Sequence, residues 1–256
     1  MRLFFTLFFC MFLSIQTFAQ VMEVGISKNG AFNQVYDAQT NMPVSNAKIT
    51  IPKQNYTTYT DDNGSFYINA QLNDTSIMSV EKEGYRPFSL TINEKIAARP
   101  IVIGIEKSNI QDIVIATEMF HLGDNNFSNA SANSNEFKAD SVGPAYSKKF
   151  NMSVETKNKK NYLVIGSIIG IDTLMARSIN QNRILNSYSS APQVYFNGQK
   201  IAEIQINGDN QKIKLPNNII KIGQNEVTIK TGKNLMQTAY IDYDDIELMN
   251  LSIQSE

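Results

Sequence analysis

Short runs of alternating apolar and polar residues recur along the chain, and turn residues separate them. The clearest, each bounded by Gly, Asn, Asp or Pro, are residues 47–51, 65–68, 162–165, 213–215 and 226–230. A period of two with β-branched and aromatic side chains is typical of strands. Turns about every ten residues favour β-sandwiches, and no long stretch has convincing helical periodicity. The sequence therefore predicts an all-β protein.

The first nineteen residues are typical of a cleavable export signal. Arg2 precedes a run rich in Leu and Phe, and Thr17-Phe18-Ala19 gives the small-x-small pattern of a cleavage site. The run is short for a membrane span, so an uncleaved anchor is the weaker alternative. We expect an exported protein, located in the periplasm, at the cell surface or outside the cell, with no integral membrane segment after cleavage.

Residue counts exclude several kinds of site. The one cysteine, Cys10, lies in the predicted signal, and His121 is the one histidine. Disulfides, a cysteine nucleophile and a multi-histidine metal site are therefore excluded from the mature chain. The chain has 23 basic and 24 acidic residues, so sequence-independent nucleic-acid binding is not expected. His121 has no convincing nucleophile or second base beside it, so we expect a packing or loop residue and no catalysis.

Residues 28–106 form the first predicted unit. Asp61-Asp62-Asn63-Gly64 predicts a tight hairpin, because Asp and Asn side chains bond turn amides and Gly accepts a positive φ. A calcium loop is the alternative, but the regular spacing and the downstream Glu of an EF-hand are missing. With Gly84-Tyr85, this hairpin resembles the carboxypeptidase-regulatory-like domain, a transthyretin-like β-sandwich of exported proteins in Bacteroidetes-type bacteria. The resemblance implies a spacer without peptidase activity.

Residues 107–118 are predicted to form a linker strand, and residues 119–253 a second, larger sandwich. Asn197-Gly198 predicts a type I′ hairpin turn, and a loop at residues 220–225 precedes a strand. With the acidic C-terminal segment, these features resemble the galactose-binding-like jelly roll of carbohydrate-binding modules.

That jelly-roll resemblance implies a structural calcium that joins the opening loop to the last strand. Asp124 from the loop and Asp244 or Asp245 from the strand are the predicted ligands, since hard oxygen donors suit calcium. Ile241 and Tyr243 are expected in that strand, with the acidic residues on its other face. A solvated acidic strand end is the alternative.

A sugar site should combine an aromatic face with planar hydrogen-bonding groups. The predicted binding residues are Arg177, Asn182, Arg183 and Tyr188, although an ordinary polar loop would look the same. The predicted function is an exported, non-catalytic binding protein whose partner is a polysaccharide or other glycan, with the first unit as spacer. A structural or adhesive envelope protein that contacts other proteins is the alternative, and a glycan-active enzyme is a weaker one.

Overall fold

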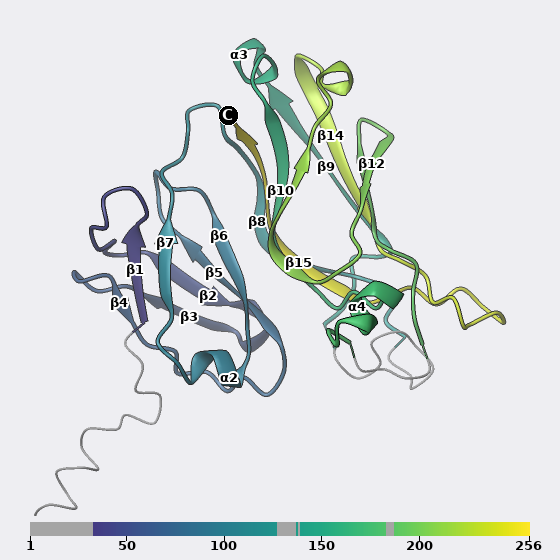
Figure 1. The fold of residues 1–256 in the computed structure, drawn as a ribbon, viewed down its shortest axis with the longest axis horizontal. Coiled ribbons are helices and arrows are strands. Elements are labelled where there is room, and N and C mark those ends of the chain that lie inside the picture. Colours follow the sequence, from purple (N-terminus) through teal and green to yellow (C-terminus); the bar gives the residue numbers. More distant parts are fainter. Residues whose placement is uncertain (1–32, 127–136, 138, 183–186) are drawn as a thin grey trace, which may run out of the picture.

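The computed structural model describes residues 33–126, 137, 139–182 and 187–256 (Figure 1). The predicted export signal, residues 1–19, lies outside them. The described chain folds into two β-sandwiches that follow one another in sequence. The expected all-β class with two sandwich domains is thereby confirmed.

The first sandwich pairs a three-stranded sheet, in the order β4-β1-β7, with a four-stranded sheet, in the order β3-β2-β5-β6. Its elements are β1 (Asn33–Asp37), β2 (Lys48–Ile51), η1 (Pro52–Gln54), β3 (Tyr56–Tyr59), β4 (Ser65–Phe66), β5 (Ser76–Glu81), β6 (Phe88–Ile92), α2 (Glu94–Ala97) and β7 (Val102–Ile105). The predicted hairpin forms between β3 and β4, where Asp61 Oδ1 accepts hydrogen bonds from the backbone N–H groups of Asn63 and Ser65. Gly64 takes a φ of 72° there.

The second sandwich pairs two four-stranded sheets, in the orders β13-β10-β15-β8 and β12-β11-β14-β9. Its elements are β8 (Ile113–Leu122), β9 (Ala145–Met152), α3 (Val154–Lys157), β10 (Asn161–Ile169), α4 (Leu174–Ser178), β11 (Gln193–Phe196), β12 (Gln199–Glu203), β13 (Gly208–Lys214), η2 (Asn217–Ile219), β14 (Gly223–Lys230) and β15 (Ile246–Ser255). Asn197 and Gly198 have φ angles of 48° and 81°, as the predicted type I′ turn requires.

Each sandwich has its own apolar core, and the two also pack against each other. The larger core fills the space between the two sheets of the second sandwich, and a separate core fills the first. Strands β5 and β6 pack on the other face of β10, β13 and β15. Every residue of β15 is buried as a result. The sheet that contains β5 and β6 and the two sheets of the second sandwich are therefore stacked in more than two layers at this contact.

Helices contribute little to the described chain, since none exceeds five residues. No described helix has the length and apolarity that a membrane crossing needs.

Candidate functional site

The contact between the two sandwiches has a polar part beside an apolar cluster of Ile77, Phe137, Ile169 and Met249. The Asp209 carboxylate of β13 accepts three hydrogen bonds through Oδ1: from the backbone N–H of Thr91 at 2.9 Å, from Thr91 Oγ1 at 2.8 Å and from Ser167 Oγ at 2.7 Å. Thr91 lies on β6 of the first sandwich, whereas Ser167 lies on β10 of the second. One carboxylate thus joins the two sandwiches.

Close approach between the sandwiches depends on a glycine in β10. A Cβ added to Gly166 would lie 2.5 Å from Ser89 Oγ and 2.7 Å from Asn250 Cβ. Asn250 also donates from Nδ2 to Ser79 Oγ of the first sandwich at 3.3 Å. Any larger side chain at Gly166 would push β6 away from β10.

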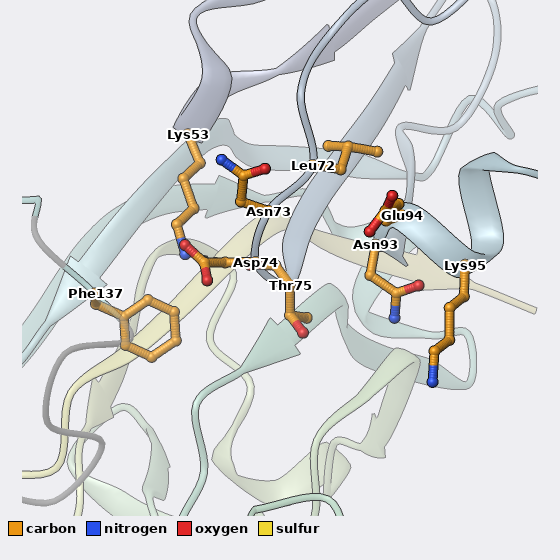
Figure 2. A pocket seen from close by; sticks show the side chains of 9 residues that line it. All are labelled: Lys53, Leu72, Asn73, Asp74, Thr75, Asn93, Glu94, Lys95 and Phe137. Carbon is orange, nitrogen blue, oxygen red and sulfur yellow. The ribbon is translucent and has the colours of Figure 1, made fainter. Parts of the chain in front are cut away.

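Two adjoining cavities open beside this contact, and together we call them the interdomain cleft. The first has a volume of about 420 Å³, and the second of about 310 Å³. Thr75, Asn93 and Phe137 line both. The first is lined otherwise by Lys53, Leu72, Asn73, Asp74, Glu94 and Lys95 (Figure 2). The second is lined otherwise by Thr91, Ile169, Gly170, Gln181, Asn182, Asn207, Gly208 and Asp209.

The elements of both sandwiches hold the cleft walls in place. Asn93 caps α2, because its Oδ1 accepts a hydrogen bond from the backbone N–H of Ile96 at 3.0 Å. On the opposite wall, Gln181 and Asn207 are joined by two hydrogen bonds of 2.9 Å between side chain and backbone. The backbone that carries these amide side chains is therefore held in place on both walls of the cleft.

Phe137 forms the floor where the two cavities meet. The ring packs edge-on against His121, with centroids 5.6 Å apart, and Lys53 Nζ lies 4.9 Å from its centroid. A Cβ at Gly170 would come within 2.4 Å of the ring. Because only 2% of Phe137 is exposed, the ring is not a stacking platform for a sugar, and recognition in the cleft has to rely on hydrogen bonds.

Below this floor lies a buried ion pair that the sequence analysis did not anticipate. His121 Nε2 and Asp245 Oδ1 are 2.8 Å apart, and His121 Nδ1 lies 3.9 Å from Glu247 Oε1. All three side chains are buried. Burial by itself lowers the pKa of His121, but the two carboxylates outweigh it and raise this pKa to about 9. His121 is therefore an imidazolium at neutral pH.

Burial raises the pKa of Asp245, and the charges of Asp124 and Asp242 add to this effect, while His121 opposes it. The proximity of these carboxylates shows that the opening loop and the C-terminal segment do meet. Asp124 Oδ1 accepts a hydrogen bond from the N–H of Asn126 at 3.0 Å, and Asp124 Oδ2 accepts one from the N–H of Tyr243 at 2.8 Å.

The prediction that the acidic residues lie on one face of the last strand was wrong. Strand β15 begins only at Ile246, and Asp242, Asp244 and Asp245 precede it and are buried. Asp244 Oδ2 accepts a hydrogen bond from the backbone N–H of Asp172 at 3.1 Å. The carboxylates are buried because this segment crosses the end of the sandwich, where loops supply donors that a strand face would not.

Several oxygens of the predicted calcium ligands Asp124, Asp244 and Asp245 are bonded to protein donors, as described above. In the part of the chain that the structure describes, no three His, Cys, Asp or Glu side chains are arranged to hold a metal ion. Calcium at this end of the sandwich stays a prediction.

The predicted sugar-binding residues do not form one exposed surface in the described structure. Asn182 is buried and lines the second cavity. Arg177 Nε lies 3.9 Å from Asp172 Oδ1, and Tyr188 is half-buried outside the cleft lining. Arg183 lies outside the described residues. Reasoning from sequence missed Thr75, Asn93 and Asp209, since they belong to no motif and meet only through the packing of the two sandwiches.

The comparisons with known proteins bear mainly on the first sandwich. Residues 34–115 match the family model of the CarboxypepD_reg-like domain. The resemblance to the carboxypeptidase-regulatory-like domain is confirmed for this sandwich, and the match extends into the start of β8. No curated protein matches the sequence.

A solved structure of a "putative carbohydrate binding protein" from Bacteroides uniformis is similar at 10% identity over 88% of this chain and 98% of that one, with a TM-score of 0.22. A TM-score of this size is no basis for inferring shared architecture.

Proposed function

We propose that the chain is an exported, non-catalytic glycan-binding protein that holds its ligand in the interdomain cleft. The observation that carries this proposal is the lining of the cleft: side-chain amides, hydroxyls and carboxylates from both sandwiches surround cavities of about 420 and 310 Å³. These volumes are in the range of small-molecule sites, roughly 300–1,000 Å³.

The lining suits a polyhydroxylated ligand. Asn73, Asp74 and Thr75 are exposed side chains on one wall. On the other wall, the Gln181 and Asn207 amides bond the backbone and keep that wall in shape. The Asn73 amide both donates and accepts, and the Asp74 carboxylate accepts, so the exposed wall matches the donor and acceptor character of sugar hydroxyls. The CarboxypepD_reg-like domain then supplies half of the site instead of acting as a spacer.

The strand order of the second sandwich supports the same proposal. Eight strands in two four-stranded antiparallel sheets are typical of a jelly roll, as the resemblance to galactose-binding-like modules implies. The predicted signal at residues 1–19 supports export. A non-catalytic role is supported by the burial of His121 against Asp245 and by the three donors on Asp209.

The test is a glycan array on the full chain, followed by calorimetry with the glycans that bind. Replacing Asn73 and Asp74 with Ala should weaken binding by about tenfold or more, corresponding to about 1.4 kcal/mol. Asp62→Ala/Asn69→Ala changes two exposed residues of the same sandwich that do not line the cleft, and it should bind normally. Equal binding by all three proteins would contradict the proposed site.

One observation favours a second candidate, an envelope protein that contacts other proteins. The segment between β14 and β15 projects from the second sandwich (Figure 1), and Leu235, Met236, Tyr240 and Ile241 on it are exposed. Large exposed apolar patches are typical of surfaces that contact other proteins or membranes. Cross-linking of the intact protein in its own envelope, with loss of the product on Leu235→Ser/Ile241→Ser, would support this candidate.

A further inference from the structure

A pair of lysines lies at the end of the second sandwich remote from the buried carboxylates. Strand β10 begins at Asn161, which pairs with Ser255 at the end of β15, while Ile169 at the other end of β10 pairs with Glu247. Lys160 directly precedes β10, and Lys214 ends β13 beside it. The two turns are joined by a 2.9 Å hydrogen bond from the N–H of Leu215 to the carbonyl of Asn161. This end lies near α3 in Figure 1.

A cavity of about 490 Å³ opens between the two turns. It is lined by Lys160, Lys214, Leu215, Pro216 and Asn217. Leu215 is buried, whereas Pro216 and both lysines are exposed. The site therefore combines two ammonium groups from separate turns with an apolar floor and one side-chain amide. We call it the lysine pocket.

The two lysines have no carboxylate within 4.0 Å among the described residues, whereas Lys212 lies 3.9 Å from Glu256 Oε1. Lys157 at the end of α3 and Lys159 in the turn that follows add further positive charge. The acidic residues of these same segments are Glu155 and Glu256, both exposed. The local excess of lysines contrasts with the net charge of −1 for the whole chain.

We propose that the lysine pocket binds the carboxylate of an acidic sugar unit, so that the preferred ligand is a polysaccharide containing uronic acid. This inference rests on the proposed glycan-binding function and adds a second contact for the same polysaccharide, at the opposite end of β10 from the interdomain cleft. A uronic acid presents a carboxylate that two lysines attract and a face of C–H groups that packs on Pro216. Asn217 also lines the pocket, and a side-chain amide can both donate to and accept from sugar hydroxyls.

The near-neutral overall charge favours recognition of individual sugar carboxylates at one pocket over diffuse attraction of a polyanion along the whole surface. Nucleic acid would need a continuous basic surface, which the net charge of −1 does not provide. The ligand group that fits the lysine pocket is thus a sugar carboxylate, and its attraction to the two lysines should be sensitive to salt.

The experiment compares the full chain with Lys160→Gln/Lys214→Gln by calorimetry, using oligogalacturonate and a neutral galactan oligosaccharide at low and high salt. The wild-type chain should bind oligogalacturonate more tightly, and by a margin that shrinks at high salt. The double variant should bind oligogalacturonate about tenfold more weakly and the neutral oligosaccharide unchanged. Lys148→Gln/Lys149→Gln is the matched control, because it removes two exposed lysines of β9 that do not line the pocket.

Equal losses in both lysine variants would overturn the inference, since they would indicate diffuse charge instead of a pocket. Tight binding of the neutral oligosaccharide with none of oligogalacturonate would overturn it too, while leaving the proposed glycan-binding function intact. Binding of neither probe, with no glycan bound on the array, would overturn both.

Discussion

His121 and Asp245, which are 124 positions apart in sequence, form an ion pair of 2.8 Å in the interior of the second sandwich. The pair joins β8 to the segment before β15, at the level where the opening loop and the C-terminal segment meet. On the other side of the imidazole, Glu247 Oε1 lies 3.9 Å from His121 Nδ1. The Glu247 carboxylate accepts no hydrogen bond from the described residues. The imidazolium is therefore the counter-ion of this carboxylate cluster.

Stability should fall as the pH rises above neutrality. The pKa of His121 is raised to about 9 in the folded chain, against about 6.5 in an unfolded one. A raised pKa contributes stability that is complete below pH 6.5 and is lost as the pH rises through about 9. Thermal melts from pH 6 to 10 should show a Tm that declines over this window, and a His121→Gln variant should lack that part of the decline. A flat wild-type profile would show that the imidazole is neutral.

Removing one partner of the pair should strongly destabilise the fold. His121→Gln leaves Asp245 and Glu247 buried without their counter-ion, which costs about 3–5 kcal/mol when a buried pair is broken. Denaturant unfolding measures this cost. His121→Gln/Asp245→Asn should recover part of the lost stability, because it also removes a buried charge, and a double variant as unstable as the sum of both single variants would refute the coupling.

Loss of the Asp209 carboxylate should loosen the contact between the sandwiches. Asp209→Ala removes three hydrogen bonds to Thr91 and Ser167, with an expected cost of about 1–3 kcal/mol. If this contact couples the two sandwiches, the calorimetric trace of the variant should show two separate unfolding transitions, or one of them should be shifted. Asp140→Ala, an exposed residue, serves as control and should leave the melt unchanged. An identical melt for Asp209→Ala would mean that the contact contributes nothing.

Gly166→Ala should be destabilising in spite of its place in a strand, where Ala is ordinarily the better residue by about 0.5–1 kcal/mol. The added methyl group would meet Ser89 Oγ and Asn250 Cβ, and overpacking of this kind costs about 1–3 kcal/mol. Gly208→Ala in β13 meets only the flexible end of Gln211 and should be near neutral. Chemical unfolding of both variants tests the difference, and equal stabilities would contradict tight packing around Gly166.

Chelation tests the calcium prediction. If a calcium ion joins Asp124 to Asp244 or Asp245, a chelator should lower the Tm of the full chain, and added calcium should restore it. Asp124→Asn should then lose the response to chelator. An unchanged melt in chelator would leave the hydrogen bonds to Asn126 and Tyr243 as the whole explanation for the burial of Asp124.

Structural features that depend on residues close together in the sequence were predicted well. The strand at residues 226–230 alternates apolar and polar residues and is the end of β14. Asn197-Gly198 forms the turn between β11 and β12, because few residues accept a positive φ twice in succession. The hairpin at Asp61 and Gly64 is equally local. Such features depend on neighbours a few positions apart.

Features that depend on distant packing were beyond prediction. In β15, Ser252 and Gln254 suggest a solvent-facing side, yet both are buried, because β5 and β6 of the first sandwich cover that face. The interdomain cleft arises from the same packing, so no spacing in the sequence marks Thr75, Asn93 or Asp209 as neighbours. The burial of Asp244 likewise depends on a loop that is 72 positions away.

The connection between the sandwiches, residues 106–112, leaves little slack. Asp112 accepts from Arg86 Nε at 2.7 Å and from the N–H of Ser255 at 3.0 Å, and β8 then pairs directly with β15. Ile113 at the start of β8 pairs with Ile253 near the end of β15. Tension between the first sandwich and residue 256 would therefore act at one end of this antiparallel ladder and peel β8 from β15 one residue pair at a time.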